Sequence, residues 1–190
     1  MTSLQDKWNT IYREKSSKPT ASLVLTSYSY LLPTQGNALD LACGQGGNAL
    51  LLARTGLTVQ AWDTSSVAIS QLNRRAELEG FMIDAQVEDV ISSPPLANSF
   101  DVIVVSFFLE RTLCSQLYSA LKPGGLLFYQ TYCQQKTTQQ GPTNPDYLLE
   151  DNELLQLFSQ MKVRIYQQDA LLGDPNEGLR NQAILVAEKI

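Results

Sequence analysis

The strongest strand pattern in the chain is the apolar run at residues 100–106, Phe-Asp-Val-Ile-Val-Val-Ser. Such continuous apolar character is typical of a central strand that is covered on both faces. Shorter apolar runs predict six more strands, one that ends in Asp40 and others at residues 57–63, 82–87, 126–132, 163–168 and 183–187.

Helical periodicity fills most of the gaps between these strands. Apolar residues at helical spacing predict helices at residues 4–15, 21–32, 49–54, 112–121 and 150–161, and a further one, fourth in chain order, with an N-cap at residues 64–66 and an apolar stripe from Val67 to Ala76. Pro33 ends the second of these, since the residue before a proline disfavours helix, and Gly80 ends the fourth. Strands that alternate with helices indicate an α/β fold with a largely parallel sheet.

A glycine-rich bend follows the first strand, in the sequence Leu-Asp-Leu-Ala-Cys-Gly-Gln-Gly-Gly-Asn-Ala at residues 39–49. Gly44 and Gly46 allow a tight turn and a close approach of backbone to ligand. The following helix offers unpaired N–H groups, and Asp63, at the end of the second strand, can accept hydrogen bonds from both hydroxyls of a ribose. The order strand, bend, helix, strand, acid therefore predicts a nucleotide-binding unit.

Two cofactors fit this unit. Gly44, Gly46 and Ala49 match the Gly-x-Gly-x-x-Ala pattern of dinucleotide binders, which is weak evidence alone. Asp40 lies four residues before Gly44, where it would repel a pyrophosphate but would suit the cationic end of S-adenosylmethionine. We therefore expect Asp40 and Asp63 to hold opposite ends of S-adenosylmethionine.

Here the chain resembles the class I S-adenosylmethionine-dependent methyltransferases, whose first motif reads acid-x-Gly-x-Gly-x-Gly. Residues 40–46 read Asp-Leu-Ala-Cys-Gly-Gln-Gly, so that Ala42 replaces the first glycine and adds one methyl group. A second signature of the family, Lys-Pro-Gly-Gly before a strand, lies at residues 122–125. The resemblance covers nearly the whole chain. It implies a single-domain, Rossmann-like three-layer sandwich over residues 1–190, with a seven-stranded, mostly parallel sheet and one antiparallel edge strand.

The resemblance also implies where the cofactor lies. An Asp after the third strand receives the adenine amino group and an apolar neighbour packs on the ring, which Asp89 and Val90 match; Glu88 could replace Asp89. Ser106 is a candidate backbone contact. The expected cofactor-binding residues are Asp40, Ala42, Cys43, Gly44, Gly46, Asp63, Thr64, Asp89, Val90 and Ser106.

The acceptor is expected beside the end of the strand at residues 100–106, since ligands bind outside the carboxyl ends of strands in open α/β sheets. Arg111 could orient an anionic acceptor there, or pair with a neighbouring acid. Candidate acceptor contacts are Tyr12, Phe108, Arg111 and Tyr132. Residues 1–32 are expected to form a helical cover. The polar stretch at residues 133–149 predicts either a loop over the acceptor or a mobile surface connection.

Composition narrows the possible partners. The 190 residues suffice for one buried core, and the net charge of −5 disfavours a nucleic-acid partner. No apolar stretch reaches 18 residues and no leader pattern is present, so we expect no membrane span and a cytoplasmic location. Three cysteines without Cys-x-x-Cys spacing argue against a disulfide framework and against a thiolate metal site.

The chain contains no histidine, which removes the usual general base and the histidine-based triads and metal sites. Tyr12, Glu110 and Tyr132 are the available bases, and none can be assigned as catalytic. The chain is similar to the small tellurite-resistance and thiopurine methyltransferases, which implies a small, soft acceptor and S-adenosylhomocysteine as product. A nicotinamide-dependent oxidoreductase and a non-catalytic cofactor-binding protein remain alternatives.

Overall fold

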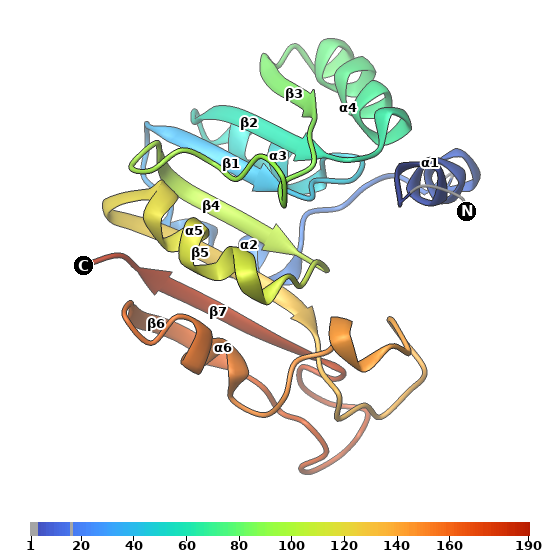
Figure 1. Ribbon diagram of the computed structural model, residues 1–190, viewed down its shortest axis with the longest axis vertical. Helices are drawn as coiled ribbons and strands as arrows, with labels where there is room; N and C mark the ends of the chain where they lie inside the picture. Colours follow the sequence, from blue (N-terminus) through green and yellow to red (C-terminus); the bar gives the residue numbers. More distant parts are fainter. Residues whose placement is uncertain (1–3, 16) are drawn as a thin grey trace.

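The computed structural model describes residues 4–15 and 17–190. Seven strands form one sheet in the order β3-β2-β1-β4-β5-β7-β6 (Figure 1). Their bounds are β1 Asn37–Leu41, β2 Thr58–Asp63, β3 Ile83–Val87, β4 Phe100–Ser106, β5 Leu121–Tyr132, β6 Lys162–Gln167 and β7 Gln182–Glu188. Strands β1 to β5 pair in parallel, whereas β7 is antiparallel to both β5 and β6. The predicted seven-stranded, mostly parallel sheet is confirmed, and its antiparallel strand lies one place in from the outermost strand.

Strand β4 lies at the centre of the sheet and joins two cores. Ile103 and Val105 pack in a cluster on one face, and Val102 and Val104 pack in a second cluster on the other. All four side chains are fully buried. Side chains alternate between the faces of a strand, so an apolar residue at every position requires cover on both sides.

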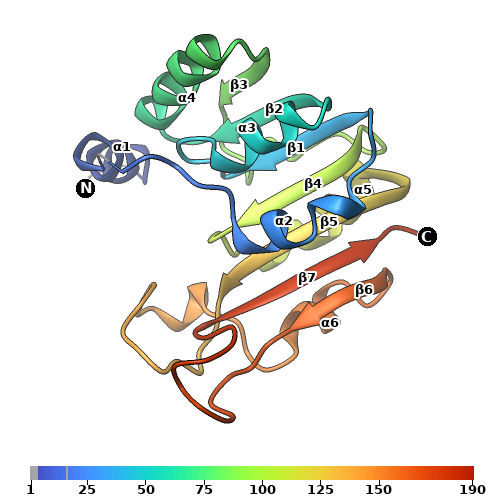
Figure 2. The ribbon, with the colours of Figure 1, turned by 180° about the vertical axis from the view of Figure 1, so that it is seen from behind.

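Helices supply that cover. Their bounds are α1 Leu4–Glu14, α2 Leu23–Ser27, α3 Gly47–Arg54, α4 Ser66–Glu79, α5 Cys114–Ala120 and α6 Glu153–Leu157. Helices α5 and α6 pack on one face, while α2, α3 and α4 pack on the other (Figures 1 and 2). The molecule is thus a three-layer sandwich. Among the helices described, none is long and apolar enough to cross a membrane.

Two predicted helices are shorter than expected. The helix predicted at 21–32 stops at Ser27, because Tyr28 leaves the helical region with φ −119° and a 3₁₀ turn, Ser29–Leu31, follows. The helix predicted at 150–161 covers only Glu153–Leu157. Phe158 ends it with φ −116°, and its fully buried ring enters the core. Tertiary packing has overridden helical periodicity at both sites.

The Lys-Pro-Gly-Gly segment forms an irregular start to β5. Leu121 already pairs with Phe100, and the register then shifts before Val102 pairs with Leu126. Gly124 has φ +78°, which the third position of a type II turn requires. The strand predicted to begin at 126 therefore begins five residues earlier.

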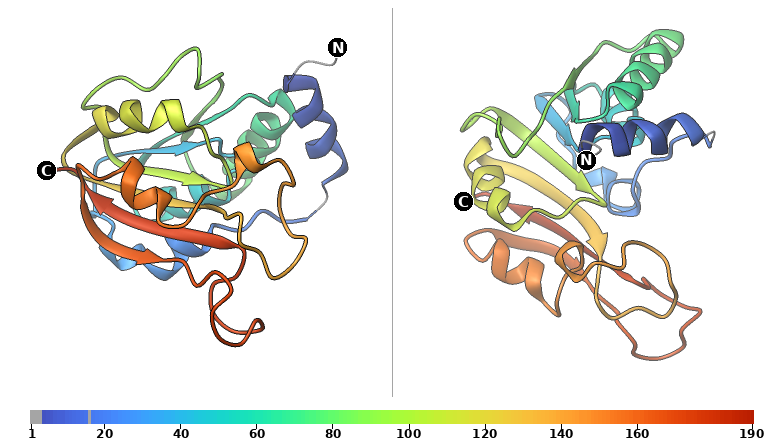
Figure 3. Two further views of the ribbon diagram at one scale, coloured as in Figure 1. Left: turned by 60° about the horizontal axis from the view of Figure 1, so that its bottom comes forward. Right: turned by 45° about the vertical axis from the view of Figure 1, so that its right-hand side comes forward.

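Helix α1 stands apart from the sheet and lies against α4, beyond the carboxyl ends of β1 and β2 (Figure 3). Asn9 is its buried residue. The side-chain oxygen of Asn9 accepts hydrogen bonds from Ser65 Oγ at 2.7 Å and from Val67 N at 3.2 Å. These polar contacts hold α1 at the first turn of α4.

Candidate cofactor-binding site

A cleft of about 450 Å³ opens at the carboxyl ends of β1, β2 and β4, below helix α1. Its volume is typical of a small-molecule site. Most of the residues predicted to bind cofactor or acceptor line it: Tyr12, Ala42, Cys43, Gly44, Asp63, Thr64, Asp89, Val90, Ser106, Phe108 and Tyr132. Asp40, Gly46 and Arg111 are absent from its lining.

The glycine bend forms the floor of the cleft. Gly44 has φ +53°, and a Cβ there would lie 2.7 Å from the hydroxyl of Tyr12. A Cβ on Gly46 would lie 2.2 Å from Leu72 of α4, so this glycine serves helix packing rather than a ligand. Ala42 also has a positive φ, +54°, which explains why a glycine suits that position of the motif. A non-glycine residue in this conformation costs about 1–2 kcal/mol.

Asp63 joins the bend to the end of β2. Its Oδ2 accepts a hydrogen bond from Gly44 N at 2.8 Å, and its Oδ1 accepts one from Ser65 N at 2.8 Å. Burial raises the pKa of Asp63, against the two backbone donors that favour its charge. A carboxylate has about four acceptor sites, so both oxygens retain capacity for ligand hydroxyls.

Asp40 lies beneath the bend and does not reach the cleft. It is fully buried, its Oδ2 accepts from Ala49 N at 2.9 Å, and its Oδ1 accepts from Asn48 Nδ2 at 3.2 Å. Burial is the main cause that raises the pKa of Asp40 to about 7. The structure corrects the expectation that Asp40 touches a cofactor. Asp40 instead accepts a hydrogen bond from the first turn of α3, and it positions the cleft-lining side chain of Asn48.

Asn48 is a lining residue that the sequence analysis missed. Its side-chain amide donates to Ser106 Oγ at 2.9 Å, and its oxygen accepts from the backbone N and the hydroxyl of Ser22 at 2.8 and 2.9 Å. Asn48 thus connects β1, β4 and the N-terminal segment. The sequence did contain a signal for this role, since Asn48 is a polar residue at the start of an otherwise apolar helical run.

The segment after β3 lines the opposite end of the cleft. Asp89 accepts from Ile91 N at 3.1 Å and from the hydroxyl of Ser92 at 3.1 Å, which fixes the turn. Val90 is buried in the core under α5. Glu88 also lines the cleft, so the choice between Glu88 and Asp89 for an adenine amino group stays a prediction.

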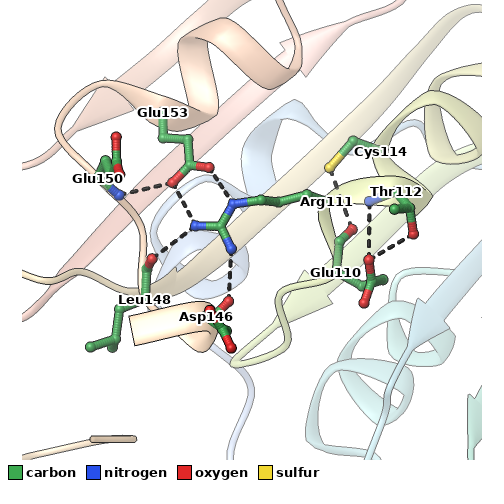
Figure 4. A network of polar contacts seen from close by, with 8 residues as sticks. All are labelled: Glu110, Arg111, Thr112, Cys114, Asp146, Leu148, Glu150 and Glu153. Carbon is green, nitrogen blue, oxygen red and sulfur yellow. Dashed lines mark hydrogen bonds and ion pairs between the residues drawn. The ribbon is translucent and has the colours of Figure 1, made fainter. Parts of the chain in front are cut away.

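Arg111 has a structural role instead of an acceptor contact (Figure 4). Its Nε and Nη2 bind the two carboxylate oxygens of Glu153 at 2.5 and 3.0 Å. Its Nη1 donates to the carbonyl of Asp146 at 2.7 Å, and Nη2 to that of Leu148 at 3.0 Å. Although burial opposes ionisation, Arg111 holds the pKa of Glu153 below its usual value. The alternative of pairing with an acid is therefore the one that the structure shows.

No candidate general base is suited to the task. Burial, followed by the charge of Asp63, raises the pKa of Tyr12 well above its usual value, and burial also raises that of Tyr132. Glu110 lies outside the cleft lining and accepts from Thr112 N and Oγ1 at 3.1 and 2.6 Å. Among the described residues, no three Cys, Asp or Glu side chains gather as a metal site would require.

Comparison with known proteins agrees with this arrangement. Residues 38–125, slightly less than half of the chain, match the family model described as a methyltransferase domain. The crystal structure of TehB from Haemophilus influenzae superposes with a TM-score of 0.73 at 22% identity, over 97% of this chain and 67% of that one. The chain has the fold of the class I S-adenosylmethionine-dependent methyltransferases, and its residues 38–125 match a methyltransferase domain.

Curated sequence relatives match the chain over part of their length. The probable S-adenosyl-L-methionine-dependent methyltransferase TehB of Haemophilus influenzae is 34% identical over 87 residues, which are 44% of this chain and 30% of that protein. A ubiquinone biosynthesis O-methyltransferase of Actinobacillus pleuropneumoniae is 31% identical over 103 residues, 49% of this chain and 44% of that protein. The chain thus spans less than half the length of these curated relatives.

Proposed function

We propose that the chain is an S-adenosylmethionine-dependent methyltransferase that acts on a small-molecule acceptor by in-line displacement. The observation that carries this proposal is the position of Asp63. Its carboxylate ends β2, lines a nucleoside-sized cleft and fixes the glycine bend through Gly44 N. A ribose laid across the two strand ends would meet that carboxylate.

Several other residues would hold the cofactor. Asp89 or Glu88 would accept the adenine amino group, with Val90 beside the ring. Ala42, Cys43, Asn48 and Ser106 line the part of the cleft nearest β1 and β4, where the amino-acid end would lie. S-adenosylmethionine supplies a methyl group made electrophilic by the sulfonium.

The chain contributes mainly orientation and exclusion of water. Tyr12 covers Gly44, and its raised pKa keeps it a neutral hydrogen-bond donor rather than a base. The acceptor must therefore be nucleophilic without a base from the chain to deprotonate it. Thiols and other soft nucleophiles meet that requirement, which favours them over alcohols that need a base.

The net charge and the cysteines support two further parts of the proposal, the class of acceptor and the compartment in which the protein works. The net charge of −5 supports a small acceptor rather than a nucleic acid. Cys43, Cys114 and Cys133 are buried free thiols, which supports a reducing, cytoplasmic setting.

The proposal predicts that Asp63→Ala weakens cofactor binding. Loss of a charge-assisted hydrogen bond costs roughly 1.5–3 kcal/mol, which corresponds to a roughly 10- to 150-fold increase in Kd for S-adenosylhomocysteine. Calorimetry measures this change. Asp84→Ala, which removes an exposed carboxyl group of β3 outside the cleft, is the matched control and should bind as the wild type does.

The same titration separates the two cofactors. We expect S-adenosylmethionine and S-adenosylhomocysteine to bind and NAD not to bind. Binding of NAD alone would establish the nicotinamide alternative. A screen of thiol, selenite, tellurite and amine acceptors then tests turnover, and cofactor binding without turnover of any of them would favour a non-catalytic protein.

A further inference from the structure

The residue after β4, Phe107, adopts a backbone conformation that few bulky residues adopt. Its φ is +57°, in the left-handed region. Its N–H donates to the carbonyl of Gln130 at 2.8 Å, so the neighbouring strand β5 holds the backbone in this state. Such strain costs about 1–3 kcal/mol and gathers at functional sites.

Burial of the Phe107 side chain does not offset the free-energy cost of this backbone conformation. The Phe107 side chain keeps 48% of its surface exposed, although its neighbours on both sides are engaged. Ser106 accepts from Asn48, and the carbonyl of Phe108 accepts from the hydroxyl of Tyr129 at 2.9 Å. The Phe107 ring instead lies against Tyr132, with ring centroids 5.2 Å apart and planes inclined by 36°.

Phe107 also lies where two hollows meet. It lines the cofactor cleft, and it lines a second hollow of about 400 Å³ formed by the N-terminal segment, β5 and the start of β7. Thr20 and Ser22 are shared by both hollows as well. A molecule in the second hollow would therefore reach the cofactor cleft past the Phe107 ring.

The sheet side of this ring offers no free charge, whereas Lys15 and Lys18 of the N-terminal segment line the cofactor cleft. The residues in or directly after β4 and β5 that line either hollow are all uncharged: Ser106, Phe107, Phe108, Gln130 and Tyr132. Gln130 is occupied, since its oxygen accepts from Val24 N and its nitrogen donates to Gln182 at 2.5 Å. The charged residues of the cofactor cleft come from the N-terminal segment and from the ends of β2 and β3.

Arg180 is the charged side chain that lines the second hollow, and it is turned to its own loop. Its guanidinium donates to the carbonyls of Ala170 at 3.0 Å, Asp174 at 2.6 Å and Glu177 at 2.6 Å. It therefore organises the loop before β7 and is poorly placed to bind an anion.

We propose that Phe107, backed by Tyr132, is the specificity-determining surface for the acceptor, and that it selects a flat, apolar ring without charged substituents. The ring would stack on the exposed face of Phe107 in the second hollow. Stacked and tilted aromatic pairs of this kind are favourable beyond the area that they bury. That the bound ring is a methyl acceptor rests on the proposed function, but binding of the ring beside Phe107 can be tested without turnover.

The test titrates two matched rings, 4-fluoroanisole and 2-fluoro-5-methoxybenzoate, which differ only in the carboxylate, by ¹⁹F NMR, with and without S-adenosylhomocysteine. The wild type should bind the neutral ring more tightly than the carboxylate. Phe107→Gly suits the positive φ and removes the ring, so it should remain folded and bind 4-fluoroanisole roughly three- to tenfold more weakly. Phe107→Tyr should bind as the wild type does.

Tyr30→Ala is the matched control, because Tyr30 is an aromatic residue with 73% exposure that lines neither hollow. Equal binding of 4-fluoroanisole by wild type and Phe107→Gly, preference for the carboxylate, or absence of ring binding would each overturn the inference. Failure of S-adenosylhomocysteine to bind in calorimetry would instead contradict the proposed function, and the ring titration without it would still decide the role of Phe107.

Discussion

Asp40 and Asp63 are buried carboxylates on adjacent strands, yet their surroundings give them different tasks. Asp63 lies at the last position of β2 and faces the cleft. Asp40 lies one residue before the end of β1, and its oxygens are turned to helix α3. The sequence shows both as acids near strand ends. Asp40 pairs with Ala61, so Asp63 lies on the same face of the sheet but two positions further along, where β1 has already ended.

The ionisation of Asp40 should make stability depend on pH. Its pKa rises from 3.8 in a free chain to about 7 in the fold, so between these values the native state binds more protons than the unfolded state. Its contribution to stability is therefore present at low pH and is lost as pH rises from about 4 to about 7. At roughly 1.4 kcal/mol per pKa unit, the loss is roughly 4–5 kcal/mol.

Asp40→Asn should remove this pH-dependent contribution. Its side-chain nitrogen would face a donor, either Ala49 N or Asn48 Nδ2, which costs roughly 1–3 kcal/mol. Urea unfolding at pH 4.5 and pH 8 should show a larger deficit of the variant at pH 4.5, with a smaller difference at pH 8. An equal deficit at both values would show that Asp40 titrates normally.

At the scale of elements, the connection from β5 to α6 is the segment that the sequence described least well. Its polar composition predicted either an acceptor cover or a mobile connection at residues 133–149. The structure ties it down, since the Arg111 side chain reaches the carbonyls of Asp146 and Leu148 and the carboxylate of Glu153 (Figure 4). These contacts join residues at least 35 positions apart, which no local pattern reveals.

Arg111→Ala should release this connection. The loss of its charged hydrogen bonds should lower the free energy of unfolding by roughly 1–3 kcal/mol and speed proteolysis within residues 134–148. Limited proteolysis with mass spectrometry maps the cuts. Arg164→Ala, which breaks the exposed ion pair with Glu188 on the outer strands, is the control and should leave that segment protected. Unchanged cleavage in Arg111→Ala would mean that other contacts hold the connection.

At the scale of the whole molecule, the sheet was readable because β4 and β7 carry continuous apolar runs, while β2, β3 and β6 alternate apolar and polar residues. The seven strands and the glycine bend could be predicted, as could most residues of the cleft. The early ends of α2 and α6 and the roles of Asp40, Asn48 and Arg111 could not, because each depends on partners distant in sequence. Phe107 was missed for a related reason, since its positive φ is imposed by the neighbouring strand.

The two cores share β4, so we expect the chain to unfold as one unit. Ile103→Ala and Val104→Ala remove fully buried side chains from opposite faces, and each should cost about 2–5 kcal/mol. Guanidinium unfolding followed by tryptophan fluorescence and circular dichroism should give coincident transitions. Met82→Ala, at a side chain that is 95% exposed, is the control and should shift stability by about 0.5 kcal/mol or less. Separate transitions would show that the cores are independent.

The place of β7 has a consequence for biosynthesis. Strand β6 leaves the ribosome before β7, and β7 is the strand with which it pairs. The outer side of β5 must also wait for residues 182–188. A nascent chain that lacks this segment therefore leaves the edges of β5 and β6 unpaired, and a chaperone that shields strand edges would be needed until residues 182–188 have been made.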